Sequence, residues 1–237
     1  MLEVIEVSTG YRPGVVVVDS ASLAVPQGEA LGVIGRNGAG KTCLAMGLMG
    51  LVAEQRGSVR VDGAEVGGRT PRERVRAGLS LVPEGRHVFG QLTVHENLRV
   101  AAHAAGRKLA KPDAEDVNDL FPVLRTKSSH RAASMSGGEQ QMLAIARALV
   151  QHPACIVLDE PSLGLAPVAI ESLAASLTGI RDRGVALLLM EQNPHLLEEL
   201  CSRVVMLDSG RVVREIPADR LRDADVVAAY MGGSLGQ

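Results

Sequence analysis

Aromatic side chains are scarce in this sequence of 237 residues, which has two tyrosines, two phenylalanines and no tryptophan. Proteins that bind single-stranded nucleic acids need several aromatic rings on which the bases can stack. The net charge of −2 provides no general attraction to a phosphate backbone or to an anionic lipid surface. We therefore expect no nucleic-acid partner, and each of the few aromatic residues becomes a candidate for a specific role.

Cysteines and long apolar runs are also few. Cys43, Cys155 and Cys201 are far apart and lack the spacing of a metal site, which favours a reduced, cytoplasmic setting without disulfides. The first residues have neither the basic nor the apolar region of a signal peptide. No apolar run approaches the roughly 20 residues that are needed to cross a bilayer. We expect a protein that is soluble by itself and reaches a membrane only through a partner.

The most informative motif is a full phosphate-binding sequence, G-x-x-x-x-G-K-[ST], between a strand predicted at Ala30–Ile34 and a helix predicted at Thr42–Leu51. Its glycines let backbone N–H groups curl around the β- and γ-phosphates, and the helix adds the positive end of its dipole. Lys41 supplies a positive charge, and the Thr42 hydroxyl can bind Mg²⁺. The predicted nucleotide-binding residues are Gly35, Arg36, Asn37, Gly38, Ala39, Gly40, Lys41 and Thr42.

Strand-sized apolar segments alternate with helical patterns over most of the chain, which predicts an α/β fold around a mainly parallel sheet. Two β-rich segments, near 2–7 and 15–25, precede the phosphate motif, and later strands are predicted at 79–82, 155–158, 185–190 and 204–207. From about 93 to 150 the chain is rich in helix formers. We predict a single domain over residues 1–237, with a core at about 1–83 and 151–237 and an inserted helical subdomain at about 84–150.

Two further segments carry nucleotide chemistry. The predicted strand at 155–158 runs into Asp159 and Glu160, and a parallel strand presents its carboxyl end at the ligand crevice. There Asp159 can hold Mg²⁺ while Glu160 polarises the attacking water. Ser136-Gly137-Gly138-Glu139 opens a helix predicted at Gln140–Val150. A capping box explains its serine and glutamate. Its two glycines, each costing about 1 kcal/mol relative to alanine, instead favour a helix end that a ligand approaches.

Other polar clusters are assigned no function. Three histidines recur every eight residues, a period that drifts by about 80° along a helix, so we expect no metal-binding face from them; they are His87, His95 and His103. Four arginines lie near a helix start at Thr70 and are expected to form a solvated surface; they are Arg69, Arg72, Arg74 and Arg76.

The phosphate motif, Met135-Ser136-Gly137-Gly138-Glu139 and Leu158-Asp159-Glu160-Pro161, in this order, resemble an ATP-binding-cassette ATPase over essentially the whole chain. The resemblance implies a P-loop NTPase fold of the RecA-like type, with an N-terminal antiparallel β region, and it implies ATP and Mg²⁺ as ligands. In that family two cassettes stack head to tail, with each ATP between one phosphate loop and the other subunit's Ser-Gly-Gly segment. Ser136, Gly137, Gly138 and Glu139 would then contact the partner's nucleotide, and Tyr11 matches the position that stacks on adenine.

A more specific resemblance is to one of the two ATP-binding subunits of high-affinity branched-chain amino-acid importers. It rests on the segments Val82–Phe89, Met135–Ile145, Pro161–Pro167 and Met190–Asn193, and on the ending Ala229–Gly233. Urea and short-chain amide importers have related subunits, so the resemblance leaves the transported solute open. It does imply the activity, which is ATP hydrolysis coupled to transport.

Four positions depart from the general cassette pattern. Glu84 replaces a glutamine that reaches Mg²⁺ and the attacking water, and its carboxylate can still bind the metal. Gln192 replaces a histidine that contacts the γ-phosphate, and it can donate only a neutral hydrogen bond. Leu165 replaces an aspartate at the dimer interface, and Cys43 replaces a hydroxyl residue with a weaker donor. The importer resemblance includes the first three changes, so the site need not be inactive. A paired subunit with the more conventional site would give an asymmetric dimer.

The resemblance therefore implies catalytic roles for Glu160, Glu84 and Gln192 and metal binding by Thr42, Asp159 and Glu84. The implied partners are a second ATP-binding subunit or a second copy of this chain, two transmembrane permeases and, indirectly, an extracytoplasmic solute-binding protein. The implied location is the cytoplasmic face of the membrane.

Non-transport cassette proteins are the competing class. DNA-repair ATPases carry a long coiled coil between the phosphate loop and the Ser-Gly-Gly segment, whereas here about 94 residues without sustained heptads separate them. Ribosome-associated cassette proteins carry two cassettes in one chain, and this chain has one. A stand-alone P-loop kinase would have neither Ser-Gly-Gly-Glu nor Asp-Glu-Pro.

Overall fold

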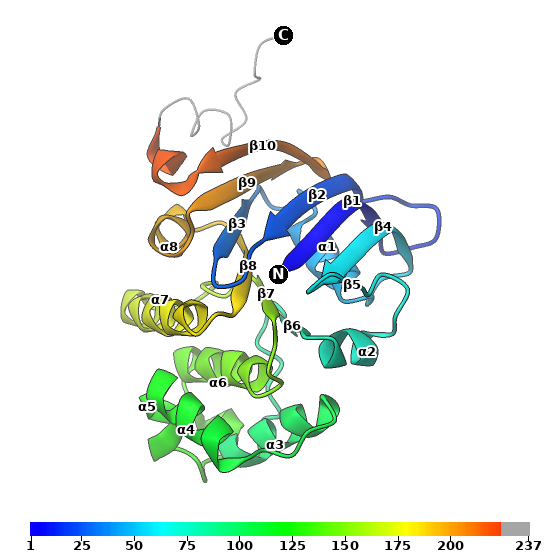
Figure 1. Cartoon of the computed structure of the whole chain (residues 1–237). Coiled ribbons are helices and arrows are strands. Elements are labelled where there is room, and N and C mark those ends of the chain that lie inside the picture. The colour runs from blue at the N-terminus through cyan, green and yellow to red at the C-terminus, as the bar shows by residue number, and fades with distance from the viewer. Residues whose placement is uncertain (224–237) are drawn as a thin grey trace.

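The computed structural model describes residues 1–223 of the chain, which form two sheets and the helices around them (Figure 1). The segment Ala229–Gly233, part of the importer resemblance, lies outside the described residues. The larger sheet has the strand order β10-β9-β3-β8-β7-β6, and the smaller has the order β2-β1-β4-β5.

The larger sheet is parallel except at one edge. It consists of β3 (Ala30–Ile34), β6 (Leu79–Val82), β7 (Cys155–Asp159), β8 (Ala186–Glu191), β9 (Arg203–Asp208) and the antiparallel edge strand β10 (Arg211–Pro217). Every residue of β3, β7 and β8 is buried, as expected for parallel strands that are covered on both faces. The α/β fold class is confirmed. The edge strand β10 was not predicted, because its alternating polar pattern lacks the apolar run of a buried strand.

The smaller sheet is antiparallel and contains β1 (Leu2–Gly10), β2 (Val18–Val25), β4 (Glu54–Val61) and β5 (Ala64–Glu65). It confirms the implied N-terminal antiparallel region. The predicted strand at 15–25 begins later than expected, at Val18, since Val15 donates a backbone hydrogen bond to Arg12 and closes a turn through Gly14 at φ 77°.

Helices cover both faces of the larger sheet (Figure 1). The helix after the phosphate loop, α1 (Lys41–Leu48), is packed between the two sheets and shares a buried apolar cluster with both. On the other face lie α7 (Pro167–Asp182) and α8 (Pro194–Leu200). A short helix, α2 (Pro71–Arg76), precedes β6. This arrangement fixes the start of α1 at the carboxyl end of β3.

A group of helices lies beyond β6, at the end of the molecule far from the smaller sheet (Figure 1). It contains α3 (Val94–Ala104), α4 (Lys111–Leu120), α5 (Pro122–Thr126) and α6 (Gly137–Leu149). Thr93 and Ser136 each form a capping box, at the starts of α3 and α6. The box at Ser136 is the one that the sequence indicates. That these helices form a separate subdomain stays a prediction.

The expectation that the arginine cluster is solvated is wrong for one of its members, Arg74. Arg74 is 2% exposed, and its guanidinium donates to the carbonyls of Gly47 and Leu48 at 3.1 and 2.6 Å. Further donated bonds reach the Arg69 carbonyl at 3.0 Å, the Gln55 side chain at 2.7 Å and the Gly67 carbonyl. The cation thereby satisfies carbonyls at the end of α1, where the helix dipole is negative. The sequence does not show this because the acceptors come from three separate segments, at 47–48, 55 and 67–69.

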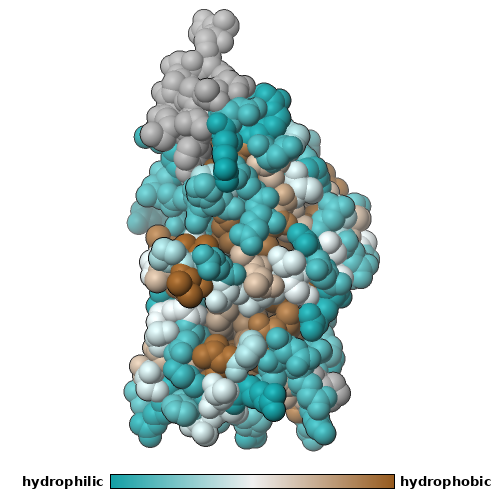
Figure 2. All heavy atoms as spheres, turned by 90° about the vertical axis from the view of Figure 1, so that its left-hand side faces the viewer, coloured by the Kyte–Doolittle hydropathy of each residue, from teal (hydrophilic) through white to brown (hydrophobic). Residues whose placement is uncertain are grey.

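Within residues 1–223, no helix has the length and apolarity that crossing a bilayer requires. The face on the α7 and α8 side carries apolar patches divided by hydrophilic residues (Figure 2). Apolar side chains exposed near the start of α7 include Leu163 at 53% and Val168 at 73%. Such patches are typical of surfaces that meet a partner.

Candidate functional site

A cavity of about 480 Å³ lies above the phosphate loop, at the carboxyl ends of β3, β7 and β8. This is the crevice in which open α/β sheets bind ligands. The cavity brings together residues that are up to 181 positions apart in the chain, from position 11 to position 192. Its lining residues are Tyr11, Val17, Asn37, Gly38, Gly40, Lys41, Thr42, Cys43, Glu84, Glu160, Leu163 and Gln192.

The phosphate loop closes tightly between β3 and α1. A Cβ atom on Gly35 would lie 2.5 Å from the Leu207 carbonyl oxygen, so that position has no room for a side chain. Gly40 has φ 110°, a conformation that disfavours other residues, and it caps α1 without a side chain. The first N–H groups of α1 therefore have no side-chain acceptor and can receive an anion.

Lys41 lies at the base of the cavity and is only 5% exposed. Its Nζ donates to the Gly35 carbonyl at 2.8 Å and lies 3.2 Å from Oε1 of Glu160. The amide Nε2 of Gln192 donates to that same Oε1 at 2.6 Å and to Oδ1 of Asn37 at 2.8 Å. The structure thus places the predicted base, Glu160, in direct contact with both Lys41 and Gln192.

Glu160 is held in place by its backbone as well as by these contacts. Its φ is 47°, in the left-handed region, which costs about 1–2 kcal/mol for a residue with a side chain. Its N–H donates to the Met190 carbonyl at 2.8 Å, which ties the end of β7 to β8. The conformation turns the Glu160 carboxylate out of the strand direction and into the cavity.

Asp159, the residue before Glu160, ends β7 and is 2% exposed. Burial raises the pKa of its carboxyl from an ordinary 3.8 to about 6. The charges of Glu160 and Glu84 raise it further, while a hydrogen bond from the Thr42 side chain and the charge of Lys41 oppose the shift. One carboxylate oxygen, Oδ1, has no hydrogen-bond partner among residues 1–223. A buried oxygen without a donor is suited to a cation.

The predicted base-stacking residue, Tyr11, is 52% exposed and lines the cavity at its outer side. Its hydroxyl is paired with the Cys43 thiol, and burial is the main reason that both groups have raised pKa values. Asp159 is buried and does not line the cavity. Three predicted residues of the phosphate loop, Gly35, Arg36 and Ala39, do not line it either. They shape the loop instead: the Arg36 carbonyl accepts from Lys41 at 3.4 Å and from the Ala39 N–H at 3.1 Å.

The segment Ser136–Glu139 lies outside this cavity, at the start of α6. The capping box is formed: the Glu139 carboxylate accepts from the Ser136 N–H at 2.9 Å, and the Ser136 hydroxyl accepts from the Glu139 N–H at 3.3 Å. Lys127 holds the same carboxylate at 2.6 and 2.7 Å and is the main cause of its lowered pKa. The Gly138 position has a packing reason too, since a Cβ there would lie 2.9 Å from Cβ of Ala169.

Sequence reasoning assigned no role to Glu191, which organises the cavity edge from the end of β8. Its carboxylate accepts N–H donors from Ser162 at 2.8 Å, Gln192 at 2.8 Å and Asn193 at 3.1 Å. The residue is 2% exposed. A carboxylate at the last position of a buried strand is the signal that could have identified it.

Comparison with known proteins places this site in a family. Residues 18–163 match the family described as ABC transporter, and the chain belongs to this family. Over 234 residues, 98% of this chain and all of the relative, it is 40% identical to the high-affinity branched-chain amino acid transport ATP-binding protein BraG of Pseudomonas aeruginosa. It is 33% identical to a probable branched-chain amino acid transport ATP-binding protein, LivF, of Archaeoglobus fulgidus, over 93% of this chain and 94% of that one.

A solved structure described as the ATP-binding subunit of an ABC transporter is 30% identical to this chain. It superposes with a TM-score of 0.79, covering 98% of this chain and 96% of that one. The sequence resemblance to a cassette ATPase, and to the branched-chain importer subunits in particular, is confirmed.

Proposed function

We propose that this chain binds and hydrolyses ATP as the energy-providing subunit of an importer for branched-chain amino acids. The observation that carries the proposal is the cavity above the phosphate loop, in which Lys41 meets Glu160, with the buried Asp159 directly before Glu160 at the end of β7. The solute rests on the names of the relatives at 40% and 33% identity. An importer of urea or short-chain amides is the alternative.

ATP fits the cavity with its phosphates at the start of α1 and its base on Tyr11. The loop from Gly35 to Thr42 presents N–H donors, and Lys41 adds the positive charge for the β- and γ-phosphates. To reach them, Lys41 leaves the Glu160 carboxylate, which lies 3.2 Å away. Burial raises the pKa of the Tyr11 hydroxyl, and the Cys43 thiol contributes to the same shift.

The oxygen ligands suit Mg²⁺, which would be held by the Thr42 hydroxyl, the Glu84 carboxylate and the unpaired Oδ1 of Asp159. When bound, the ion neutralises charge that accumulates on the phosphates. Among residues 1–223, no three His, Cys, Asp or Glu side chains form a metal site by themselves. The nucleotide phosphates would therefore complete the coordination.

Hydrolysis needs a base beside the attacking water. Glu160 accepts the proton as the water oxygen bonds to the γ-phosphorus and the bond to the β–γ bridging oxygen breaks. Gln192 positions this carboxylate through its 2.6 Å hydrogen bond and can donate a neutral bond to the γ-phosphate. Glu84, in the loop after β6, also lines the cavity and can orient the water or the metal.

The Ser136–Glu139 segment would act on a second nucleotide. It does not line this chain's own cavity, yet it presents the start of a 13-residue helix. A head-to-tail dimer, with a paired ATP-binding subunit or a second copy of this chain, would place it over the partner's phosphate loop. Leu163 and Leu165, in the loop after Glu160, would lie at that interface.

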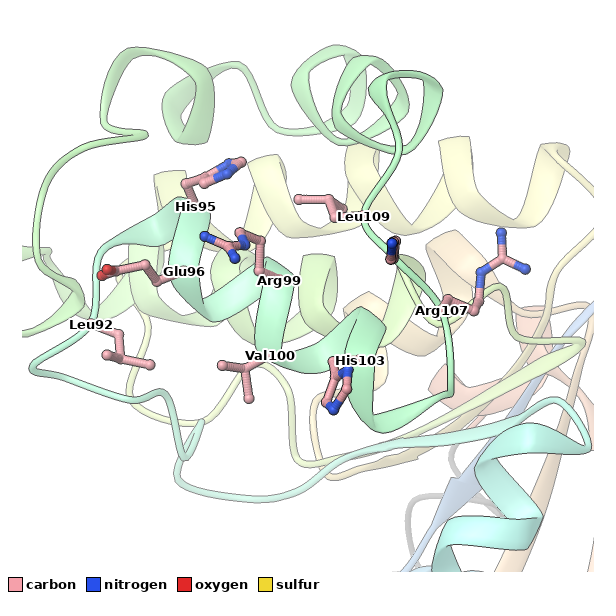
Figure 3. A pocket seen from close by; sticks show the side chains of 9 residues that line it. Leu92, His95, Glu96, Arg99, Val100, His103, Arg107 and Leu109 are labelled. Carbon is pink, nitrogen blue, oxygen red and sulfur yellow. The ribbon is translucent and has the colours of Figure 1, made fainter.

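A basic groove on the helical group provides a place for a transmembrane permease to dock. Its volume is about 770 Å³, and its apolar lining residues are Leu92, Val100 and Leu109. His95, Arg99 and His103 project from successive turns of α3, and Arg107 follows on the next segment (Figure 3). Lys108 also lines it, and Glu96, its one acidic residue, is engaged by the N–H and hydroxyl of Thr93 at 2.8 and 2.9 Å. An acidic segment with a few apolar side chains complements this groove.

Replacing Glu160 with Gln tests the hydrolytic role, because an amide cannot accept the proton from water. We expect Glu160→Gln to bind ATP in calorimetry while the transporter's phosphate release falls at least about 100-fold. Glu171→Gln, exposed on α7, is the matched control and should keep normal turnover. Wild-type turnover in Glu160→Gln would remove Glu160 as the base.

Arg99→Glu tests the docking groove. We expect it to reduce the permeases that copurify with a tagged chain, while ATP binding by the isolated chain is unchanged. Arg72→Glu, on the exposed side of α2, carries the same charge change outside the groove and should retain the permeases. Full recovery of permeases with Arg99→Glu would place the docking surface elsewhere.

A further inference from the structure

The loop from Gly85 to Phe89 connects the nucleotide cavity to the helical group. Glu84 lines the cavity, and three consecutive residues after it have positive φ: Gly85 at 83°, Arg86 at 69° and His87 at 47°. Two of these are not glycine, so the left-handed path is unfavourable for the isolated chain and must be imposed by neighbours. A loop held in this way points its side chains in fixed directions.

Two side chains of the helical group impose the path. Asn97, fully buried on α3, accepts from the Phe89 N–H at 2.9 Å and donates to the Phe89 carbonyl at 3.0 Å. Arg147, on α6, donates to the His87 carbonyl at 2.7 Å and lies over the Phe89 ring with its guanidinium carbon 4.6 Å from the ring centre. Arg86 is thus fixed between a cavity residue and two anchored residues.

The Arg86 guanidinium lies against the first turn of α6. A Cβ atom on Gly137 would lie 2.9 Å from both of its terminal nitrogens, so the guanidinium occupies the space that any other residue at 137 would need. Within residues 1–223, Arg86 has no hydrogen-bond or ion-pair partner. The nearest carboxylate on this turn, Glu139, is already held by Lys127 and by the Ser136 N–H.

This placement is suited to binding an anion. The start of a helix carries positive partial charge, which repels a cation and attracts an anion. Arg86 adds a planar set of N–H donors, a geometry suited to phosphate oxygens, to that same positive region. Neither Arg86 nor Ser136–Glu139 lines the described cavity of this chain, which favours an anion other than this chain's own nucleotide.

We propose that Arg86 contacts the γ-phosphate of the ATP held by the partner subunit and stabilises the charge that develops there during hydrolysis. The proposal rests on the head-to-tail dimer of the proposed function and adds to it a cationic residue that acts across the interface. Glu84 and Arg86, two positions apart, then serve different nucleotides: the first belongs to this chain's site and the second to the partner's site.

A mixing experiment tests the direction of action if the chain pairs with itself. Arg86→Gln removes the cation, and Lys41→Ala disables nucleotide binding by the chain that carries it. We expect each variant alone to lose about 100-fold in ATP turnover. Their mixture should recover a substantial part, because one site then combines an intact phosphate loop with an intact Arg86 from the other chain. No recovery on mixing, with each variant able to dimerise, would overturn the proposal.

If the chain pairs with a different ATP-binding subunit, the assembled transporter is used instead. Lys41→Ala leaves the partner's nucleotide as the one that turns over, and adding Arg86→Gln should lower that residual rate about 100-fold. Adding Arg72→Gln, on the exposed side of α2, should not change it. An unchanged rate in Lys41→Ala with Arg86→Gln would overturn the proposal.

Two measurements separate this proposal from other outcomes. The isolated Arg86→Gln chain should bind ADP with wild-type affinity, since its own cavity is intact; a loss there would show a role within the chain and overturn action across the interface. Arg86→Lys keeps the charge without the planar donors and should recover part of the turnover, which a packing role alone would not predict. Absence of ATP turnover in the wild-type transporter would instead refute the proposed function.

Discussion

Asp159 allows a direct test of the stability cost of ionising a buried carboxylate, because its side chain is buried with one oxygen unpaired. Its pKa is raised from 3.8 to about 6, chiefly by burial. The folded protein therefore holds the proton more tightly than the unfolded chain does between these two values. Stability must fall as pH rises through this range, and the full penalty is present above about pH 6.

The size of this effect follows from the shift. A difference of roughly two pKa units, at 1.36 kcal/mol per unit, corresponds to about 3 kcal/mol when Asp159 is fully ionised. About half of that penalty develops between pH 5 and pH 8, because the unfolded-state carboxyl is already mostly ionised at pH 5. Asp159→Asn keeps the side-chain shape and has no charge to bury, so it removes this pH-dependent penalty.

The assay is urea unfolding of the nucleotide-free protein in EDTA at several pH values. We expect the stability of Asp159→Asn relative to wild type to rise by about 1–2 kcal/mol from pH 5 to pH 8. Excess Mg²⁺ at pH 8 should stabilise wild type and have little effect on Asp159→Asn, since the cation offsets a charge that the variant lacks. Parallel stability curves for the two proteins would show that Asp159 is not protonated preferentially in the folded state and would refute the reasoning.

Two further perturbations test the base position and the packing behind the phosphate loop. Tyr11→Ala should weaken ATP and GTP binding alike by about 5- to 150-fold in calorimetry, because stacking on a base contributes roughly 1–3 kcal/mol and a ring face does not distinguish purines; equal affinity of variant and wild type would move the base elsewhere. Arg74→Met should lower the free energy of unfolding by about 3–5 kcal/mol, since it leaves buried carbonyls at the end of α1 without donors. Arg72→Met, on the exposed side of the same helix, should stay within about 0.5 kcal/mol, and a similar small loss for Arg74→Met would contradict the structural role.

The sequence alone determined the parts whose signal is local. The phosphate motif specifies its own glycine-rich loop, and the apolar runs at Ala30–Ile34 and 155–158 specify buried strands because each run lies within a single element. Ser136 with Glu139 marks a helix start through contacts only three residues apart. The family resemblance then followed from the order of these motifs.

Only the tertiary structure decided how distant groups meet. The contact of Lys41 with Glu160, and of Glu160 with Gln192, depends on the parallel register of β3, β8 and β7, which no local pattern encodes. The edge strand β10 has a weak apolar pattern and forms because β9 offers it an open edge. Arg74 and Arg86 look alike in sequence as surface cations, yet one is buried among carbonyls and the other lies on a helix start. Their surroundings are assembled from segments far apart in the chain. The role of each arginine therefore depends on the fold and cannot be inferred from the local sequence.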